Sequence, residues 1–127
     1  MAELCNEIHA VVGDKVGKLA EVAAKLNDLG INISALCAWV DRGIGHLRMV
    51  TDDNEKTCGA LSDIVENCRR SVVVGVTAAN RIGSLGEIAG KIAAEGIAIK
   101  SAYATAAGEQ ALIVLDTSDN EKAASLV

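Results

Sequence analysis

The feature that most constrains this chain is an internal repeat with an offset of 66 residues, which aligns Val16 with Ile82. Three blocks match without a gap, and Gly, Leu, Glu, Ala and Lys recur at equivalent positions in the longest of them. Such agreement indicates duplication of one structural unit. The period is too long for a solenoid of helix pairs and suits a compact unit of several strands and two helices. The aligned blocks are 16–25 with 82–91, 30–33 with 96–99, and 51–56 with 117–122.

Each copy begins with an apolar run that predicts a strand, followed by an amphipathic pattern that predicts a helix. The two strands are expected at residues 4–12 and 71–78. In each helix the apolar residues recur at three- and four-residue spacing, which forms one stripe for the core. The stripe residues are Val16, Leu19, Val22, Ala23, Leu26 and Leu29 in the first copy, and Ile82, Leu85, Ile88, Ala89 and Ile92 in the second.

Both ends of these helices carry terminating residues. Asp14 and Asn80 stand just before the helices, where a side-chain oxygen can accept from a first-turn amide, so both are predicted N-caps. Gly30 and Gly96 follow the last turn, where a residue in the left-handed conformation ends a helix.

Two further strands and a second helix complete each copy. Ile-x-Ile opens a strand that is expected to run to about Val40 or Ala106, and a turn containing Gly joins it to the next strand. Asp53 and Asp119 are predicted to cap the second helix, which is expected to reach about Glu66 in the first copy. The next strands are expected at 44–51 and 110–117.

The resulting order is β-α-β-β-α followed by a strand, which predicts an antiparallel sheet with both helices on one face. Residues 68–78 are expected to form one long strand, because the repeat period leaves no room for a loop there. We therefore expect a first unit at residues 1–70 and a second at residues 71–127.

The second copy ends early, because Val127 corresponds to Leu61 by the repeat offset. It therefore lacks its own last strand, and a strand edge without a neighbour invites pairing with another chain. We expect the edge beside residues 71–78 to be covered by a strand from a second subunit, or the sequence to stop short of the natural C-terminus.

Composition excludes several classes of function. The net charge of −5 argues against binding of nucleic acid, and Trp39 and Tyr103 are too few aromatic residues to stack on bases. No apolar run approaches the roughly 20 residues of a membrane span, and the N-terminus has no signal-peptide pattern. A cytoplasmic location is expected, with neither nucleic acid nor membrane as a partner.

The four cysteines and two histidines are the candidates for metal or redox chemistry. The cysteines show no C-x-x-C pair and no zinc-ligand spacing, so reduced and mostly buried thiols are expected, with a metal or redox role as the alternative. His9 and His46 are expected near Arg48 on the sheet face opposite the helices, as a metal site or as an ordinary surface pair. No catalytic triad, buried carboxylate pair or phosphate-binding loop is present, so neither an enzyme nor a cofactor is expected.

The run Asp14-Lys-Val-Gly-Lys-Leu-x-x-Val-x-x-x-Leu-x-x-x-Gly-Ile-Asn-Ile33 resembles the core signature of ACT domains, which are small regulatory modules that bind amino acids. Residues 80–99 resemble it as well, so the chain is similar to the stand-alone tandem ACT proteins of bacteria. The resemblance implies an α+β fold of two ferredoxin-like βαββαβ units in tandem. The second copy departs from the signature at Ala98, where the first copy has Asn32.

A helix N-terminus favours a carboxylate, because it presents unpaired amides and a partial positive charge. Gly17 and Gly83 lack a Cβ that would block approach to that backbone, and Asp14 or Asn80 could accept from an ammonium group. The resemblance places Asn32 at a contact between units, where it could bind the ligand of the neighbouring loop. The alternative is that these residues only cap helices and form turns. The candidate ligand-binding residues are Asp14, Lys15, Val16, Gly17, Asn32, Asn80, Arg81, Ile82 and Gly83.

The leading hypothesis is a non-catalytic regulatory protein that binds an amino acid or a similar small molecule at an interface between ACT units, as a homodimer or larger assembly. A second hypothesis is a protein–protein interaction module without a ligand. A third is a small metal-binding protein that uses His9, His46 and the cysteines.

Overall fold

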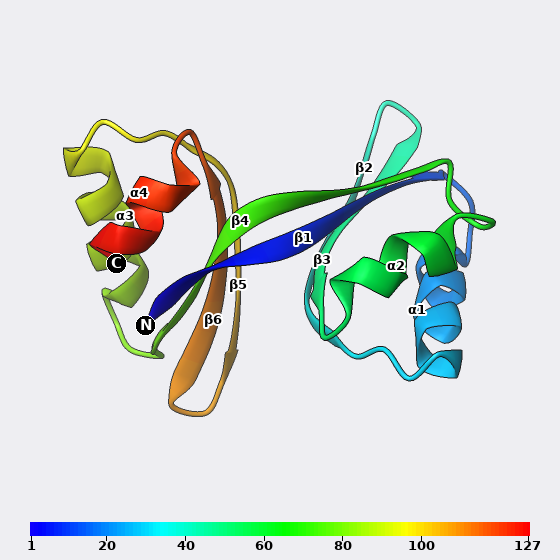
Figure 1. The fold of residues 1–127 in the computed structure, drawn as a ribbon, viewed down its shortest axis with the longest axis horizontal. Coiled ribbons are helices and arrows are strands. Elements are labelled where there is room, and N and C mark those ends of the chain that lie inside the picture. Colours follow the sequence, from blue (N-terminus) through cyan, green and yellow to red (C-terminus); the bar gives the residue numbers. More distant parts are fainter. The chain divides into compact units, whose positions relative to one another are not determined.

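The structure is a computed structural model that describes residues 1–127. It is an α+β fold in which one order of strands and helices occurs twice (Figure 1). Neither of the two longest helices, each of 11 residues, nor any shorter one could traverse a lipid bilayer. The elements are β1 (Ala2–Gly13), α1 (Lys18–Asp28), β2 (Ile33–Asp41), β3 (Ile44–Thr51), α2 (Asn54–Leu61), β4 (Asn67–Ala79), α3 (Ser84–Ala94), β5 (Ile99–Ala107), β6 (Gln110–Thr117) and α4 (Asn120–Leu126).

The strands pair in the order β2-β3-β1-β4-β6-β5, and two of them serve both compact units. The first unit comprises residues 6–71, and the second comprises residues 1–5 together with 72–127. This division differs from the expected one, because the 12-residue β1 begins in the second unit and continues into the first. The predicted long strand at residues 68–78 is confirmed: it is β4, which begins in the first unit and continues into the second.

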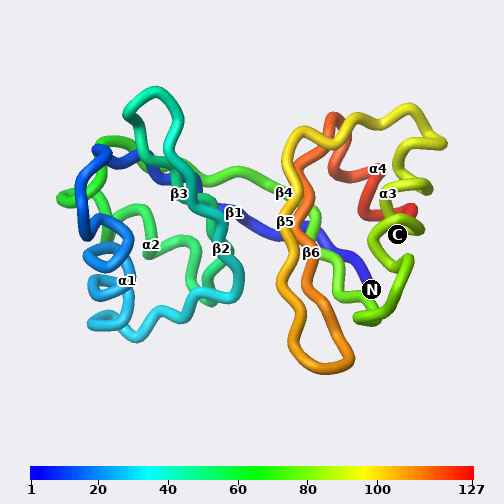
Figure 2. The backbone as a smooth tube through the Cα atoms, turned by 180° about the vertical axis from the view of Figure 1, so that it is seen from behind, coloured from blue at the N-terminus to red at the C-terminus, as the bar shows by residue number.

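The N-terminus of the chain covers the edge of the second unit that we expected a second subunit to cover. The ammonium group of Met1 donates to the carbonyl of Thr77 at 2.9 Å, and the Thr77 amide donates to the carbonyl of Met1 at 2.9 Å. This segment is the blue N-terminal end of the tube in Figure 2, where it can be followed to β4. The prediction of a strand from another chain at this edge is therefore wrong, because β1 is long enough to supply the strand itself.

The hairpin strands were predicted correctly, whereas the second helix was predicted too long. β3 and β6 occupy the expected residues 44–51 and 110–117. Helix α2 ends at Leu61 and not near Glu66, because the Glu66 amide already donates to the Val11 carbonyl at 2.8 Å. Residues after Leu61 must therefore turn the chain back toward β1.

The caps of α2 and α4 were predicted correctly, and the bonds around them repeat between the copies. The side chain of Asp53 accepts from the Lys56 amide, and that of Asp119 accepts from the Lys122 amide. The adjacent asparagines also repeat their contacts: Asn54 donates to the carbonyl of Asn6, and Asn120 to that of Val72. The duplication seen in the sequence therefore extends to individual hydrogen bonds.

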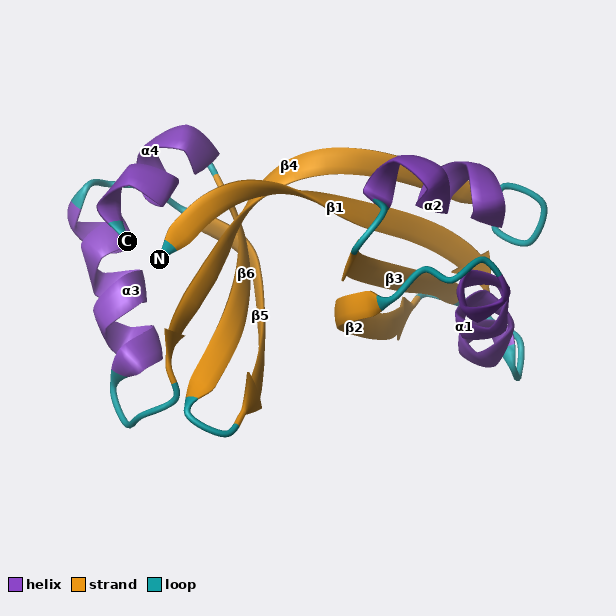
Figure 3. Cartoon of the chain, turned by 60° about the horizontal axis from the view of Figure 1, so that its bottom comes forward, coloured by secondary structure: helices purple, strands orange, loops and turns teal.

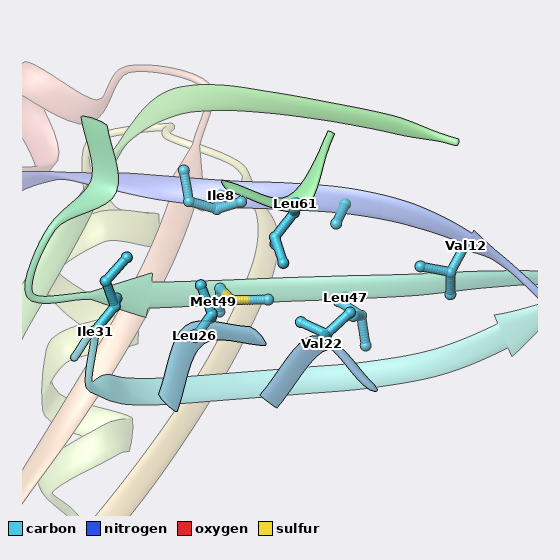
Figure 4. Close-up of a cluster of buried hydrophobic side chains, with 9 residues drawn as sticks. Ile8, Val12, Val22, Leu26, Ile31, Leu47, Met49 and Leu61 are labelled. Carbon is cyan, nitrogen blue, oxygen red and sulfur yellow. The ribbon is translucent and has the colours of Figure 1, made fainter. Parts of the chain in front are cut away.

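In each unit the two helices lie on the same side of the strands, as Figure 3 shows. In the first unit the core lies between the helices and the strands, with Val22 and Leu26 of α1 against Leu47 and Met49 of β3 (Figure 4). The buried stripe is narrower than predicted, because Leu19 and Leu29 are about half exposed. In the second unit Ile88 and Ile92 are the buried residues of α3.

Cys58 of α2 and Cys68 of β4 form a disulfide, whereas Cys5 and Cys37 are free. The expectation of four reduced thiols is therefore wrong for one pair. The early end of α2 explains the pairing, because the chain turns back at once and the two Cα atoms come within 5.5 Å of each other.

Removing this disulfide by Cys58→Ala should lower the free energy of unfolding by about 2–4 kcal/mol, because the cross-link restricts the unfolded chain. Urea denaturation with and without a reducing agent measures the effect. The reducing agent should destabilise the wild type and the matched control Cys37→Ala equally, and should leave Cys58→Ala unchanged. A wild type that is insensitive to reduction would contradict the prediction.

At one cross-strand pair the two copies divide the side-chain volume differently between the two strands. Gly45 is paired with Val12 in the first unit, and the equivalent pair in the second is Ala111 with Ala78. A Cβ on Gly45 would lie 2.6 Å from Cγ2 of Val12, which is too close for a carbon contact. A glycine is therefore required opposite valine, whereas two alanines fit each other.

Gly45→Ala should destabilise the protein by about 1–3 kcal/mol through overpacking, and Val12→Ala in the same chain should relieve that clash. We expect a coupling energy of about 1 kcal/mol or more in a double-mutant cycle measured by urea denaturation. Strict additivity of the two single changes would show that the contact is not the cause.

Candidate functional site

The loop between β1 and α1 is shaped by Gly17 in a left-handed conformation, with φ of 88°. Gly17 and its equivalent Gly83 are the N-cap residues of α1 and α3, and no side chain caps either helix. The prediction that Asp14 and Asn80 act as N-caps is therefore wrong. The chain makes one more turn at each glycine, which separates the polar side chain from the first helical amides.

A pocket of about 300 Å³ lies in the first unit, between this loop, the first turn of α1 and the strands β2 and β3. Asp14, Lys15 and Gly17 line it, so the structure brings three of the predicted residues together. No side chain caps α1, and its first-turn amides can therefore donate to an anionic group. The complete lining is Val12, Gly13, Asp14, Lys15, Gly17, Lys18, Leu19, Ala20, Ala38, Trp39, Val40, Gly45, His46 and Leu47.

Two of the predicted residues in the first copy lie outside this lining. Val16 is fully exposed at the tip of the loop. Asn32 lies at the far end of α1, where its amide donates to Oδ1 of Asp52 at 3.0 Å and its carbonyl accepts from the Asp52 amide. Asn32 therefore has no place at the pocket of its own unit.

The equivalent loop of the second unit uses its polar groups internally. Nδ2 of Asn80 donates to the carbonyl of Gly108 at 2.9 Å. Arg81 donates to both carboxylate oxygens of Glu87 at 3.1 and 2.9 Å, and this contact lowers the pKa of Glu87. Ile82 is fully exposed, like its counterpart in the first copy. The two loops thus share a backbone shape, but the second one holds its side chains in contacts within the unit.

Trp39 and His46 border the pocket, and sequence reasoning did not assign them to the site. Because Leu47 packs toward α1 and side chains alternate along a strand, the rings of Trp39 and His46 point to the opposite face of the sheet. They are paired across the β2–β3 hairpin, and their rings stack with centroids 5.0 Å apart and planes 10° from parallel. The hairpin turn at Gly43 fixes this register, so the cross-strand pairing was available in the sequence as a signal. The guanidinium carbon of Arg48 lies 5.8 Å from the Trp39 ring centroid, which is a cation–π distance.

A chain of hydrogen bonds through His9 also holds the ring of His46. Nη2 of Arg69 lies 3.1 Å from Nδ1 of His9, and a guanidinium can only donate, so Nδ1 accepts. The neutral His9 ring then carries its proton on Nε2, which donates to Nδ1 of His46 at 3.1 Å. The prediction that the two histidines share one face of neighbouring strands is confirmed.

The pKa of His9 is lowered from 6.5 to about 4, mainly by burial and in addition by the charges of Arg48 and Arg69 and by the ring of His46. Arg48 is itself paired with the buried carboxylate of Glu7 at 3.1 Å. No group of three or more His, Cys, Asp or Glu side chains is arranged to hold a metal ion.

Because the pKa of His9 is lower in the folded state, the unfolded state binds the proton more readily. The stability that neutral His9 contributes is present above about pH 6.5 and is lost as the pH falls toward 4. We expect the melting temperature to fall between about pH 7 and about pH 5, and to fall less in His9→Gln, which keeps both hydrogen bonds without titrating. Equal pH dependence in the two proteins would contradict this assignment.

The sequence matches no family model and no curated protein sequence. Among solved structures, it is similar to protein BT0572 from Bacteroides thetaiotaomicron, with 30% identity, a TM-score of 0.88, and coverage of 98% of this chain and 87% of that one. The aspartokinase alpha and beta subunits match with 18% identity, a TM-score of 0.72, and coverage of 98% and 93%. The ligand-free regulatory subunit of aspartate kinase from Thermus thermophilus matches with 13% identity, a TM-score of 0.72, and coverage of 98% and 93%.

The last two similarities concern the fold, because their sequence identities are low, and they extend over both copies of the repeat. The repeated βαββαβ topology, the glycine loop before α1 and α3, and the ACT signature in each copy agree with these structural matches. The chain belongs to the ACT-domain family and contains two ACT units in tandem.

Proposed function

We propose that this protein is a non-catalytic regulatory protein that binds a free amino acid in the pocket of the first unit. The observation that carries the proposal is the combination, in one pocket, of a helix N-terminus without a side-chain cap and the charged residues Asp14 and Lys15. An amino acid is a zwitterion, so it needs a donor for its carboxylate and an acceptor for its ammonium group. This loop offers both.

The direction of binding follows from these charges. The first-turn amides of α1 and the ammonium group of Lys15 favour the carboxylate of the ligand, because the helix N-terminus carries partial positive charge. Asp14 is exposed and can accept from the ligand ammonium. The regulatory subunit of aspartate kinase from Thermus thermophilus has the same fold, which supports a regulatory and not a catalytic role here.

We also propose that the protein acts as a homodimer. The support is a set of exposed apolar side chains that repeats in both copies, in the loop before each helix and in its first turn: Val16 and Leu19 in the first, Ile82 and Leu85 in the second. Apolar groups that are repeatedly exposed at equivalent positions suggest an interface. In such a dimer Asn32 of one protomer could contact the ligand bound to its partner.

A thermal-shift screen against the twenty amino acids tests the proposed function. A ligand at 100 times its dissociation constant should stabilise the protein by about 2.7 kcal/mol, which gives a clear rise in melting temperature. If no amino acid raises the melting temperature, the pocket is not an amino-acid site, and an interaction module without a ligand becomes the better explanation.

Matched substitutions in the two loops locate the site. Asp14→Ala should weaken binding by about 1.5–3 kcal/mol, because it removes the acceptor for the ligand ammonium. Asn80→Ala should leave binding unchanged and cost about 1 kcal/mol of stability through the lost bond to Gly108. Isothermal titration calorimetry and urea denaturation measure the two effects, and the opposite pattern would place the ligand in the second unit.

Asn32→Ala distinguishes a site shared between protomers from a site within one unit. It should weaken binding by about 1–3 kcal/mol if its amide reaches the ligand of a partner protomer. Unchanged affinity in calorimetry would make Asn32 a structural residue. Gly17→Val is a poor test of the site, because φ of 88° strains a branched residue whatever the space around it.

A further inference from the structure

We propose that the disulfide between Cys58 and Cys68 is a redox-controlled element of the ligand site, so that the first unit binds its amino acid more tightly in the oxidised protein than in the reduced protein. This inference rests on the proposed function and adds the regulation of the same site. It follows from a loop that the disulfide closes and that contacts the first turn of α1.

The disulfide closes the connection between α2 and β4. Helix α2 ends at Leu61 and β4 begins at Asn67, so residues 62–66 form this connection, and Cys58 and Cys68 lie on either side of it. Figure 3 shows the loop in teal between the two elements. The cross-link therefore limits how far the end of the helix can separate from the start of the strand.

The loop is bonded to the first residue of α1. Nζ of Lys18 donates to the carbonyl of Ile64 at 3.1 Å, and the Lys18 side chain is only 23% exposed. Lys18 also lines the ligand pocket. The loop therefore holds the helix turn whose amides are proposed to bind the ligand carboxylate, and Lys18 is a positioning residue.

The same loop borders the pocket at a second place. The Glu66 amide donates to the carbonyl of Val11 at 2.8 Å. Oε1 of Glu66 lies 3.7 Å from the position that a Cβ on Gly13 would occupy, and Gly13 lines the pocket. A shift of residues 62–66 would therefore be felt both at the end of β1 and at the start of α1.

The second copy has the same fold at these positions without a cross-link. By the repeat offset, Ala124 corresponds to Cys58 and Ala2 to Cys68. Both alanines pack against the hydrophobic core of the second unit. The geometry of the fold does not require a disulfide here, and a cysteine pair in one copy only is consistent with a role at the site of that copy.

The lysine contact is also confined to the first copy. Ser84 takes the place of Lys18 by the repeat offset, and its Oγ donates to the carbonyl of Ala79 at 2.6 Å, within its own loop. The disulfide and the lysine contact therefore occur together, in the unit whose loop lines the pocket.

A dithiol reductant opens the disulfide by thiol–disulfide exchange. A thiolate of the reductant attacks one sulfur of the pair, which forms a mixed disulfide and releases the other cysteine as a thiolate. The second thiol of the reductant then displaces the remaining cysteine, so two electrons and two protons pass from the dithiol to Cys58 and Cys68. Both cysteines are partly exposed, so a small reductant has access to them.

Reduction should weaken binding because it loosens the loop. Without the cross-link only non-covalent contacts keep residues 62–66 in place, and the bond from Lys18 to Ile64 is formed for less of the time. The first turn of α1 must then be ordered when the amino acid binds, and the entropy lost in that step lowers the affinity.

Isothermal titration calorimetry with each of the twenty amino acids, on the full chain before and after treatment with dithiothreitol, tests the proposal. The amino acid that binds most tightly to the oxidised protein should bind at least about fivefold less tightly to the reduced protein. Equal or tighter binding after reduction would overturn the inference and leave the proposed function intact. Absence of binding by all twenty in both states would instead remove the proposed function.

Cys58→Ala reproduces the residue of the second copy and removes the disulfide without a reductant. It should bind the same amino acid with the affinity of the reduced wild type, whether or not dithiothreitol is present. The matched control Cys37→Ala should keep the full difference between the two states. Wild-type affinity in Cys58→Ala, with circular dichroism showing a folded protein, would contradict the proposal.

Lys18→Met separates the loop contact from a general loss of stability, because it keeps the disulfide. It should bind at least about fivefold less tightly than the oxidised wild type and should not respond to dithiothreitol. Asp63→Asn removes an exposed contact of the same loop, with Lys25 at 3.6 Å, and should keep the full response. A full response in Lys18→Met would show that this bond does not carry the coupling.

The coupling is also measurable from the disulfide, because linkage between two sites is reciprocal. At a fixed ratio of reduced to oxidised dithiothreitol, a saturating concentration of the same amino acid should lower the ratio of reduced to oxidised protein by about fivefold or more. Thiol alkylation followed by mass spectrometry measures this ratio. An unchanged ratio in the wild type would show that the disulfide only stabilises the fold, and the inference would be wrong.

Discussion

The fold depends on the pairing of β1 with β4, because each of these strands contributes a segment to both units. The pairing runs from Glu66 beside Val11 at one end to Thr77 beside Met1 at the other. β3 and β6 then add to the outer sides of this pair, and β2 and β5 follow as the edge strands. The duplicated sequence therefore forms two units that are closed by the same two strands.

Duplication has left the backbone of the two loops nearly identical and their chemistry different. Gly17 and Gly83 have the same φ of 88°, and each precedes a helix of 11 residues without a side-chain cap. In the second unit Asn80 is bonded to the β5–β6 hairpin and Arg81 to Glu87. In the first, the polar residues of the loop line a pocket. The two copies thus share a backbone and differ in whether the polar groups of the loop are engaged within the unit.

Much of this architecture could be predicted from the sequence, because repeated positions carry the same local signals twice. The hairpin strands, the caps Asp53 and Asp119 and the long strand β4 all follow from such signals. The helix starts were misplaced because a glycine in the left-handed conformation adds a turn that no side-chain preference reveals. The repeat offset marks which positions are equivalent but not which strands are neighbours, so the second use of β1 was missed.

At the site, the loop residues were predictable, whereas the strand residues that line the pocket were not assigned from the sequence. Asp14, Lys15 and Gly17 belong to a recognisable signature, whereas Ala38, Val40 and Leu47 line the pocket from two paired strands, which no motif marks. The disulfide was missed for a related reason: Cys58 and Cys68 are separated by 10 residues, and only the early end of α2 brings them together.

The double use of β1 has a consequence for the order in which the chain can fold. The contact between Met1 and Thr77 spans 76 residues of sequence, so the residues at the start of β1 wait for most of the chain before they are paired. Contacts of such long range are slow to form, because the entropy of closing the intervening loop is lost before the contact stabilises anything. The second unit therefore closes last, and its unpaired strand edge is the surface most open to misassembly during synthesis.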